Sequence, residues 1–496
     1  MDGKRPTIAS LHGMVAAGHP AAVQAGAKLL AAGGNAFDAA VATAAALGVV
    51  EPGISGLAGM GMATCYIAAE QHVRTLDFVP RLPAAYAGGG LGCGTPGNLA
   101  GWCELAKAHG RKKLHDIFAP AVALARDGHM LIEFAGASTI KARHALQELP
   151  FFEDWRSTYL GHGSGAPGPG HVMCQPDLAR TLETIASEGP EHFYRGALGR
   201  KVIAHLQSRG GCVTMPDMAA VSPLWLEPLA AAYRGLEVHA PPLPGDGARF
   251  LRALRILDGF DLAAMERGGA DELDTVWRAI RLAAEAGGSL PDESVATLRA
   301  RLRAALPVET PQPPDPVLTS SFAVVDREGN AVCITHSLGG LFGCGVVVPG
   351  TGICLNNLLP REPPGAGLAL PLAPAIATRD GKPLLLLGSP GGDGGSQAQL
   401  QVLVQHLDHG LAIQDAIEAP RARLGAGQLV QAERRMPAAA VEALRRRGHV
   451  VEAAADWTDP VGAVQAIAID QQSGDPQTAV ATGGADPRRD GYVAVP

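Results

Sequence analysis

Apolar residues occur along this chain in two patterns, one typical of helices and one typical of strands. Spacing of three and four residues predicts helices, which we expect at residues 21–30, 36–47, 114–125, 178–185 and 397–407. Short apolar runs that end at glycine or proline predict strands, which we expect at residues 62–67, 236–240 and 384–387. Helices and strands are mixed throughout, so the pattern predicts a large protein of both α and β structure.

A hairpin is the strongest strand signal in the second half of the chain. Apolar runs at residues 321–325 and 331–335 flank the turn-forming sequence Asp-Arg-Glu-Gly-Asn at 326–330. Directly before the hairpin, residues 310–316 include four prolines. Because proline fixes φ and donates no backbone hydrogen bond, we expect an extended, exposed connector that leads into the first strand of the hairpin.

Composition narrows the class of protein. The 496 residues carry a formal net charge of −7 and no long basic run, so we expect no nucleic-acid partner. The longest apolar stretch, residues 39–50, is shorter than the roughly 20 residues of a membrane span, and no signal peptide is visible. The eight cysteines are scattered without a C-x-x-C pair, which is typical of a reduced, cytoplasmic protein.

Two patterns that often mark ligand sites have simpler explanations here. Residues 92–97 match G-x-G-x-x-G, but a dinucleotide-binding loop follows a strand and opens a helix. Here glycines precede the match and Pro96 interrupts it, so a chance match is the better interpretation. The histidines show no spacing typical of metal ligands. We therefore expect neither a cofactor nor a bound metal.

Thr319 lies where the proline-rich connector becomes a strand. If the bond between Leu318 and Thr319 were cut, Thr319 would carry both a hydroxyl nucleophile and a free α-amine. An α-amine with an ordinary pKa of about 7.7–8.0 is a general base attached to its own nucleophile. Taken alone the feature is weak, because a Thr-Ser-Ser run at a strand start is ordinarily a solvated edge.

The segment that contains Thr319 resembles a motif of the gamma-glutamyltransferase family. Residues 319–326, Thr-Ser-Ser-Phe-Ala-Val-Val-Asp, and 329–332, Gly-Asn-Ala-Val, are similar to the family's Thr-Thr-His-x-Ser-Val-Val-Asp-x-x-Gly-Asn-Ala-Val. Further segments resemble the family in the same order, at residues 31–40, 48–52, 189–196, 233–242, 256–262, 388–392 and 408–421. The resemblance therefore extends over nearly the whole chain.

The resemblance implies the fold and a processing event. The family's fold is a four-layer αββα sandwich of the N-terminal nucleophile hydrolase type. Family membership implies one precursor that cuts itself between Leu318 and Thr319. The products would be a large subunit of residues 1–318 and a small subunit of residues 319–496, intertwined in a single structural unit.

The resemblance also implies the catalytic groups. Thr319 matches the nucleophile that attacks an amide carbonyl, forms an acyl-enzyme and passes the acyl group to water or an amine. Ser337 matches a threonine whose hydroxyl supports that nucleophile. Gly391 and Gly392 match the pair whose backbone N–H groups form the oxyanion hole, where glycine allows the backbone to approach the tetrahedral intermediate closely.

The residues that would hold the substrate depart from the family pattern. Gamma-glutamyl enzymes bind the α-carboxylate of the substrate with an arginine in the sequence Asp-x-Arg-Glu. Here Val79 stands at the place of that arginine, and Arg81 follows two residues later. In a strand, two residues keep the same face but move the charge by roughly 7 Å.

Three further substrate contacts of the family are also missing. Gly339 replaces an asparagine, and Pro360 or Arg361 replaces the acid that binds the α-ammonium group. Leu370 and Pro371 replace a pair of serines. A site that binds two charges loses several kcal/mol of binding energy without these partners, so the resemblance favours a substrate without a glutamyl head group.

We therefore expect a gamma-glutamyltransferase-family amidohydrolase or acyltransferase that acts on a small-molecule amide other than an ordinary γ-glutamyl compound. An acylase and a small-amide hydrolase of the oxamate type both agree with the sequence. Arg81 and Arg361 are candidate anchors for a carboxylate on the acyl side of the substrate. The acceptor would be water or an amine, and the enzyme would be a heterodimer of self-cleaved subunits.

Two alternatives stay open. The first is an ordinary glutathione hydrolase and transpeptidase whose glutamyl contacts come from other residues. The second is a non-catalytic, unprocessed relative, because Ser320 and Ser321 replace the family's Thr-His beside the cleavage point.

Overall fold

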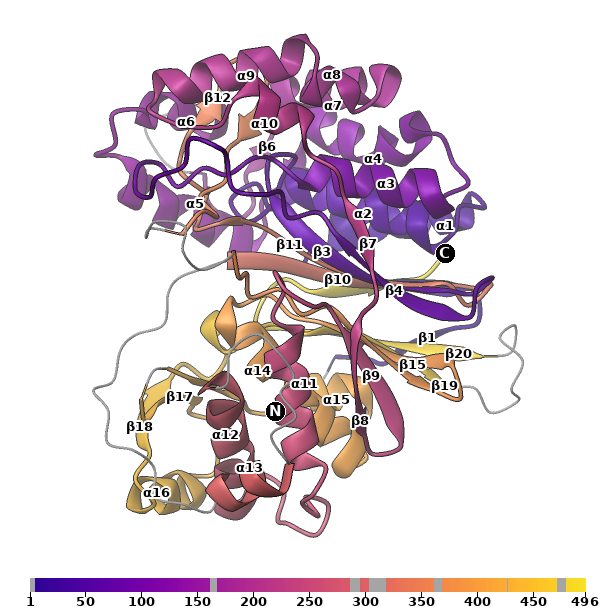
Figure 1. Cartoon of the computed structure of the whole chain (residues 1–496), viewed down its shortest axis with the longest axis vertical. Helices are drawn as coiled ribbons and strands as arrows, with labels where there is room; N and C mark the ends of the chain where they lie inside the picture. Colours follow the sequence, from indigo (N-terminus) through magenta and orange to yellow (C-terminus); the bar gives the residue numbers. More distant parts are fainter. Residues whose placement is uncertain are drawn as a thin grey trace.

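Two seven-stranded antiparallel sheets lie face to face at the centre of the molecule, with one helical layer outside each sheet (Figure 1). The computed structural model describes residues 5–160, 167–285, 295–302, 318–360, 368–425, 427–470 and 479–496. The order of layers is helix, sheet, sheet, helix. This arrangement confirms the αββα sandwich that the resemblance implies.

The first sheet carries the predicted hairpin at its centre. In spatial order its strands are β21 (Tyr492–Ala494), β2 (Gly13–Ala17), β10 (Leu318–Asp326), β11 (Ala331–Gly339), β3 (Met60–Ile67), β4 (His72–Asp77) and β7 (Leu224–Leu226). The hairpin pairs Phe322 with Ile334 and Val324 with Val332. Its register is regular except for an irregularity between Leu318 and Ser320, at the predicted cleavage point.

The second sheet covers the opposite side of the central core. In spatial order its strands are β1 (Ile8–Ser10), β20 (Val480–Ala485), β19 (Gln465–Asp470), β15 (Lys382–Gly388), β14 (Ala375–Arg379), β9 (Leu236–Ala240) and β8 (Leu229–Tyr233). Smaller pairings use β5 (His129–Met130) with β6 (Val172–Met173), β12 (Val347–Val348) with β13 (Ile353–Cys354), and β16 (Ala422–Leu424), β17 (Leu429–Glu433) and β18 (Val450–Ala454) together.

The helices divide between the two outer layers (Figure 1). Over the first sheet lie α1 (Pro20–Ala31), α2 (Ala36–Val50), α3 (Asn98–His109), α4 (Leu114–Asp127), α5 (Glu133–Leu146), α6 (Phe152–Tyr159), α7 (Pro176–Glu188), α8 (Glu191–Tyr194), α9 (Ala197–Ser208) and α10 (Met215–Ala219). Over the second sheet lie α11 (Gly247–Leu257), α12 (Ala270–Glu285), α13 (Val295–Leu302), α14 (Asp393–Leu403), α15 (Ile413–Glu418) and α16 (Ala438–Arg446).

Alternation along the strands of the hairpin decides which residues face which layer. Phe322 belongs to the core beneath the first helical layer, whereas Ala323 and Cys333 belong to the core between the sheets. Because side chains alternate between the two faces of a strand, Thr319 and Ser337 also point toward the second sheet. The candidate nucleophile is therefore enclosed between the sheets rather than at a solvated edge.

Both sheets combine strands from before and after the predicted cleavage point. The first sheet places β10 and β11 between β2 and β3, and the second places β14 and β15 beside β9. Each fragment taken alone would expose unpaired strand edges, which proteins normally cover. The two parts therefore form one folded unit.

The predicted elements largely match the observed ones. The helices predicted at 21–30, 36–47, 114–125 and 178–185 correspond to α1, α2, α4 and α7, and each is slightly longer than predicted. The helix predicted at 397–407 begins earlier, at Asp393, and continues beyond Leu403 as a π-helical turn, Val404–Asp408. The proline-rich connector at 310–316 lies outside the described residues.

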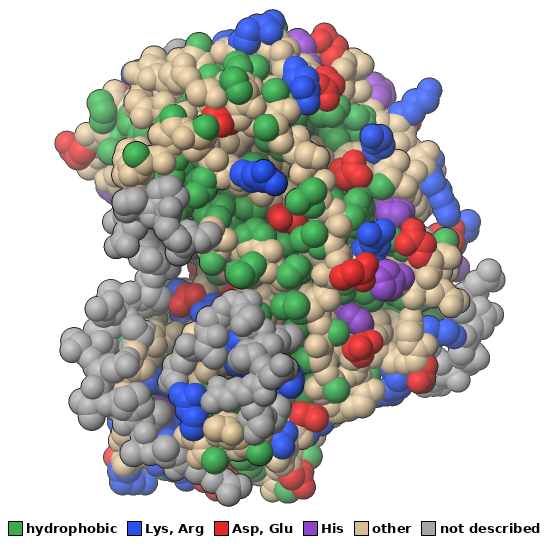
Figure 2. Space-filling model, viewed as in Figure 1, with side chains coloured by type: hydrophobic (Ala, Val, Ile, Leu, Met, Phe, Trp, Pro, Cys, Tyr) green, Lys and Arg blue, Asp and Glu red, His purple; other side chains and the backbone are tan. Residues whose placement is uncertain are grey.

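Apolar side chains gather in the middle of the face shown in Figure 2, at the level of the two sheets in Figure 1. Lysine, arginine, aspartate and glutamate are more frequent toward the top, the bottom and one side of this face. In the described part of the chain, no helix is long and apolar enough to span a membrane.

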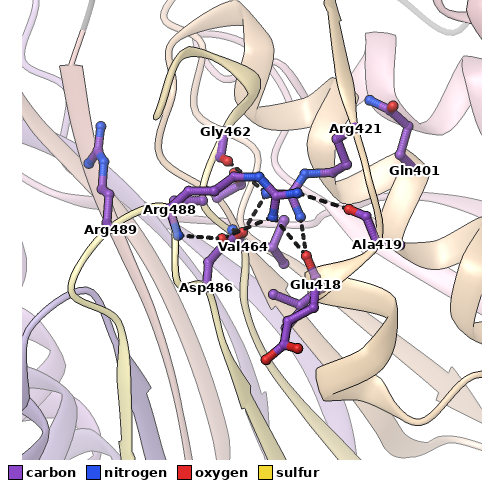
Figure 3. Close-up of polar contacts among 12 residues, drawn as sticks. Gln401, Glu418, Ala419, Arg421, Gly462, Val464, Asp486, Arg488 and Arg489 are labelled. Carbon is purple, nitrogen blue, oxygen red and sulfur yellow. Dashed lines mark hydrogen bonds and ion pairs between the residues drawn. The ribbon is translucent and has the colours of Figure 1, made fainter. Parts of the chain in front are cut away.

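A buried ionic network holds the C-terminal part of the chain against the second sheet. Figure 3 shows Arg421 and Arg488 converging on Asp486, which also accepts a hydrogen bond from the backbone N–H of Val464 at 2.9 Å. Burial acts to raise the pKa of Asp486, but the two guanidinium groups hold it below its ordinary value. Arg488 also pairs with Glu433 at 2.6 Å, and both of these side chains are fully buried.

We predict that Asp486→Asn strongly destabilises the protein. The substitution leaves Arg421 and Arg488 with an uncompensated charge in the core, and removing one partner of a buried pair costs about 3–5 kcal/mol. Denaturant unfolding of the two proteins measures the difference in the free energy of unfolding. The matched control is Asp456→Asn, whose exposed pair with Arg434 should contribute about 0–1 kcal/mol. Equal effects of the two substitutions would contradict the importance of the network.

Candidate active site

Thr319 is fully buried at the start of β10, and its hydroxyl is held from the second sheet. The backbone N–H of Gly391 donates a hydrogen bond to Thr319 Oγ1 at 3.0 Å. Gly391 lies three residues after the end of β15, and α14 begins two residues later. The predicted nucleophile and the predicted oxyanion-hole residue, 72 positions apart in the sequence, are thus in direct contact.

The turn that contains Gly391 and Gly392 requires glycine at both positions. Their φ angles are +124° and +59°, a region that residues with a side chain rarely adopt. A Cβ atom on Gly391 would lie 3.0 Å from Gly462 Cα. The turn directs the N–H of Gly391 at Thr319, and the N–H of Gly392 makes no hydrogen bond within the described residues.

Ser337 contacts the carbonyl group of the predicted scissile bond. Its Oγ donates a hydrogen bond to the carbonyl oxygen of Leu318 at 2.5 Å. Ser337 Oγ in turn accepts one from the backbone N–H of Gly339 at 2.7 Å. The hydroxyl of Thr319 and the carbonyl of Leu318 are therefore each fixed by a separate hydrogen bond before any cleavage.

Arg489 is a site residue that the sequence interpretation missed. Its Nη1 donates a hydrogen bond to the carbonyl oxygen of Thr319 at 2.7 Å, and the guanidinium group also pairs with Asp459 and stacks over Phe134. Figure 3 shows that Arg489 points away from the neighbouring network around Asp486. Its only sequence signal is the run Asp-Pro-Arg-Arg at 486–489, which does not indicate a contact with a residue so distant in the chain.

Glu51 is a second residue that was not predicted as part of the site. It is the C-terminal cap of α2, and its carboxylate accepts a hydrogen bond from Ser320 Oγ at 2.7 Å. Burial raises the pKa of Glu51, while Arg489 and the Ser320 hydroxyl act in the opposite direction. Ser320, at the place of the family's second threonine, therefore has a hydroxyl bound to Glu51, and this contact fixes β10 beside Thr319.

Two of the positions that depart from the family pattern belong to one apolar cluster. Val79, at the place of the family's arginine, packs with Met60, Met62 and Leu370. Leu370 stands at the place of the family's first serine. Two of the four missing polar contacts are thus replaced by hydrocarbon side chains that touch the same neighbours.

Gly339 leaves no room for the asparagine that the family carries. Its φ is +99°, and a Cβ atom there would overlap Oδ1 of Asn357. That oxygen accepts a hydrogen bond from the N–H of Gly340 at 2.7 Å. The side chain of Asn357 therefore occupies the space next to the turn after β11.

The two predicted carboxylate anchors are not brought into this site by any described contact. Arg81 is exposed in the loop after β4, and its side chain forms no hydrogen bond or ion pair with another described residue. Arg361 lies outside the described residues. Their assignment as anchors stays a prediction. In the described chain no cluster of histidine, cysteine, aspartate and glutamate has the composition of a metal site.

Asp77 is a buried carboxyl group at the edge of the apolar cluster. It pairs with Met62 in the strand register, so both side chains lie on the same face of the sheet. Its Oδ1 accepts a hydrogen bond from the N–H of Val79 at 2.8 Å. Burial outweighs this bond and raises the pKa of Asp77 to about 6.

We predict that Asp77 makes the stability of the protein depend on pH. A carboxyl group with a raised pKa keeps its proton in the folded state while the unfolded chain has lost it. Its contribution is therefore fully present below the unfolded pKa of about 4 and is lost as the pH rises to about 6. Asp77→Asn keeps the acceptor for the N–H of Val79 but does not titrate. Between pH 4 and pH 8 its free energy of unfolding should therefore rise relative to that of the wild type by up to about 3 kcal/mol.

Denaturant unfolding at both pH values measures this change. The matched control is Asp380→Asn in an exposed turn, which should leave the pH dependence as it is in the wild type. An unchanged pH dependence in Asp77→Asn would contradict the assignment.

Comparison with known proteins places these features in a family. A family model described as gamma-glutamyltranspeptidase matches residues 22–495. The Acylase ACY 1 proenzyme of Pseudomonas sp. (strain SE83) is 31% identical over 90% of this chain and 88% of the relative. The glutathione hydrolase-like YwrD proenzyme of Bacillus subtilis (strain 168) is 30% identical over 96% of this chain and 97% of the relative.

Solved structures agree with this assignment. The crystal structure of cephalosporin acylase from Bacillus halodurans has a TM-score of 0.90 and 31% identity, and the match covers 100% of this chain and 98% of that one. Helicobacter pylori gamma-glutamyltranspeptidase has a TM-score of 0.52 and 27% identity, over 57% of this chain and 88% of that one. The chain therefore belongs to the gamma-glutamyltranspeptidase family and is an amidohydrolase or acyltransferase of the N-terminal nucleophile type.

Proposed function

We propose that this enzyme cleaves itself between Leu318 and Thr319 and then uses Thr319 to take an acyl group from a small-molecule amide. The observation that carries the proposal is the pair of hydrogen bonds at this peptide: Gly391 N–H to Thr319 Oγ1 and Ser337 Oγ to Leu318 O. One fixes the attacking atom, and the other contacts the oxygen on which negative charge would develop. The proenzyme names of the relatives support the same processing event.

Self-cleavage would begin with attack of Thr319 Oγ1 on the carbonyl carbon of Leu318. The carbon–nitrogen bond breaks, the nitrogen takes up the proton, and Leu318 becomes an ester on the threonine hydroxyl. In the tetrahedral intermediate the former carbonyl oxygen is negative, and the Ser337 hydroxyl donates to it. Water then hydrolyses the ester, which leaves the Leu318 carboxylate and the free α-amine of Thr319.

Amide turnover would use the same atoms a second time. The α-amine of Thr319 accepts the hydroxyl proton while Oγ1 attacks the substrate carbonyl, and the leaving amine takes that proton as the amide bond breaks. The N–H of Gly391, which donates to Thr319 Oγ1 in the uncleaved chain, is then available to the substrate oxyanion together with that of Gly392. Water or an amine finally removes the acyl group.

Arg489 and Glu51 would act as positioning residues in both stages. Arg489 holds the carbonyl oxygen of Thr319, and Glu51 holds the side chain of Ser320, so the backbone on the carboxyl side of the nucleophile is fixed at two points. A fixed backbone keeps the attacking oxygen in one geometry, which lowers the entropic part of the barrier.

We further propose a cytoplasmic enzyme composed of the two self-cleaved fragments. All eight cysteines are free thiols, which supports a reducing compartment. The mixed strand order of both sheets supports two fragments that stay together.

We predict two fragments, residues 1–318 and 319–496, in the purified wild-type protein. A denaturing gel and intact-mass measurement identify the break, and Thr319→Ala should remain whole because it lacks the attacking oxygen. Thr319→Ser keeps a hydroxyl and is the matched control, which should still be cut. A wild-type chain that stays at 51.0 kDa would contradict the mechanism and favour a non-catalytic relative.

We predict that Ser337→Ala slows self-cleavage by about 10²–10³-fold, because one donor to the developing oxyanion is lost. Ser337→Thr retains the hydroxyl, and we expect cleavage at a rate close to that of the wild type. The rate is measured from the appearance of the small fragment after synthesis in a cell-free system. Equal rates for the alanine and threonine variants would remove Ser337 from the proposed machinery.

A further inference from the structure

A buried apolar cluster, of which Val79 is the half-buried member, begins two strands away from the candidate nucleophile. We call it the apolar wall and define it by Met60, Met62, Val79, Leu358, Leu370 and Leu372, which pack as one cluster. These residues come from four separate stretches of the chain. The wall is thus built from β3, the loop after β4 and the segments that flank residues 361–367.

The strand register places this wall beside the reacting atoms. Ser337 on β11 pairs with Met60 on β3, and Ser337 itself touches the carbonyl oxygen of Leu318. Neighbouring strands lie about 4.8 Å apart, so Met60 is roughly 10 Å from Thr319 across the sheet. The side chains of Thr319 and Met60 lie on the same face of the sheet, so the long side chain of Met60 and a short acyl chain on Thr319 cover that distance together.

The wall provides no partner for a carboxylate. Val79 and Leu370 stand where the family resemblance places an arginine and a serine. Asp77, on the same face as Met62, carries a carboxyl group that would repel a second one. A charged group held against hydrocarbon side chains loses its hydration without replacement, which is strongly unfavourable.

We propose that the acyl group accepted by Thr319 is an uncharged hydrocarbon chain that packs on the apolar wall at Val79, its half-buried member. This inference rests on the proposed function and adds the class of acyl donor. The acyl chain would run from the ester at Thr319 past Ser337 toward Met60 and Val79. Anchoring of a carboxylate by Arg81 or Arg361 is the competing assignment.

The test uses the processed wild-type enzyme and four p-nitroanilides of similar length: butyryl, succinyl, 4-aminobutyryl and γ-glutamyl. Release of p-nitroaniline gives kcat/KM, and intact mass of the small fragment detects the acyl-enzyme. We expect butyryl to exceed each charged compound at least tenfold. Extension to hexanoyl should raise kcat/KM about fourfold for each buried methylene.

Variants of the wall test whether it causes the preference. Val79→Ser should reduce the butyryl to succinyl ratio about tenfold, while Val79→Ile, the matched control, should keep it. Leu224→Ser, a polar substitution at an exposed leucine on β7, should leave the activity unchanged. Because Val79 is only partly buried, its variants are expected to fold, and their self-cleavage confirms this independently.

The outcomes separate the two proposals. Preference for succinyl, 4-aminobutyryl or γ-glutamyl, with acylation of Thr319, would overturn the hydrocarbon assignment and leave the proposed function intact. Preference for γ-glutamyl in particular would identify an ordinary glutathione hydrolase. Processed enzyme that forms no acyl-enzyme with any of these anilides would overturn both proposals.

Discussion

The hydrogen bond from Gly391 to Thr319 is the contact on which the rest of the site depends, because it joins the two sheets at the hydroxyl oxygen proposed to react. It requires β10 in one sheet and the turn after β15 in the other to approach within 3.0 Å. Glycine at 391 and 392 permits that approach, since the backbone there adopts positive φ angles. The buried arginine network around Asp486 holds the neighbouring C-terminal segment, from which Arg489 reaches Thr319.

The sequence predicts the fold well, and it indicates the segments of the candidate site, for physical reasons that are local. The hairpin at 321–335 follows from apolar runs around a turn, and the glycine pair at 391–392 follows from a strand that runs into a helix. The family resemblance connects these separate segments to one site. The contact between Gly391 and Thr319 then agrees with that connection, although neither residue indicates it alone.

The residues that surround Thr319 could not be predicted from the sequence in the same way. Arg489 lies 170 residues after Thr319, and Glu51 lies 269 residues before Ser320, so both contacts depend on the tertiary fold. The substitutions at 79 and 370 are visible in the sequence as missing polar groups. Only the structure brings them to the same cluster and shows that hydrocarbon replaced what was lost.

The contact between Arg489 and Thr319 joins residues far apart in the sequence, and this has a consequence for the synthesis of the protein. The arginine that fixes the carbonyl oxygen of Thr319 is synthesised 170 residues after the threonine itself. The ribosome must therefore have added that whole length of chain before the geometry at residue 319 is complete. The geometry at Thr319 is in this way tied to the synthesis of residue 489, and an interrupted chain that lacks this residue carries the proposed nucleophile without the group that holds its carbonyl oxygen in place.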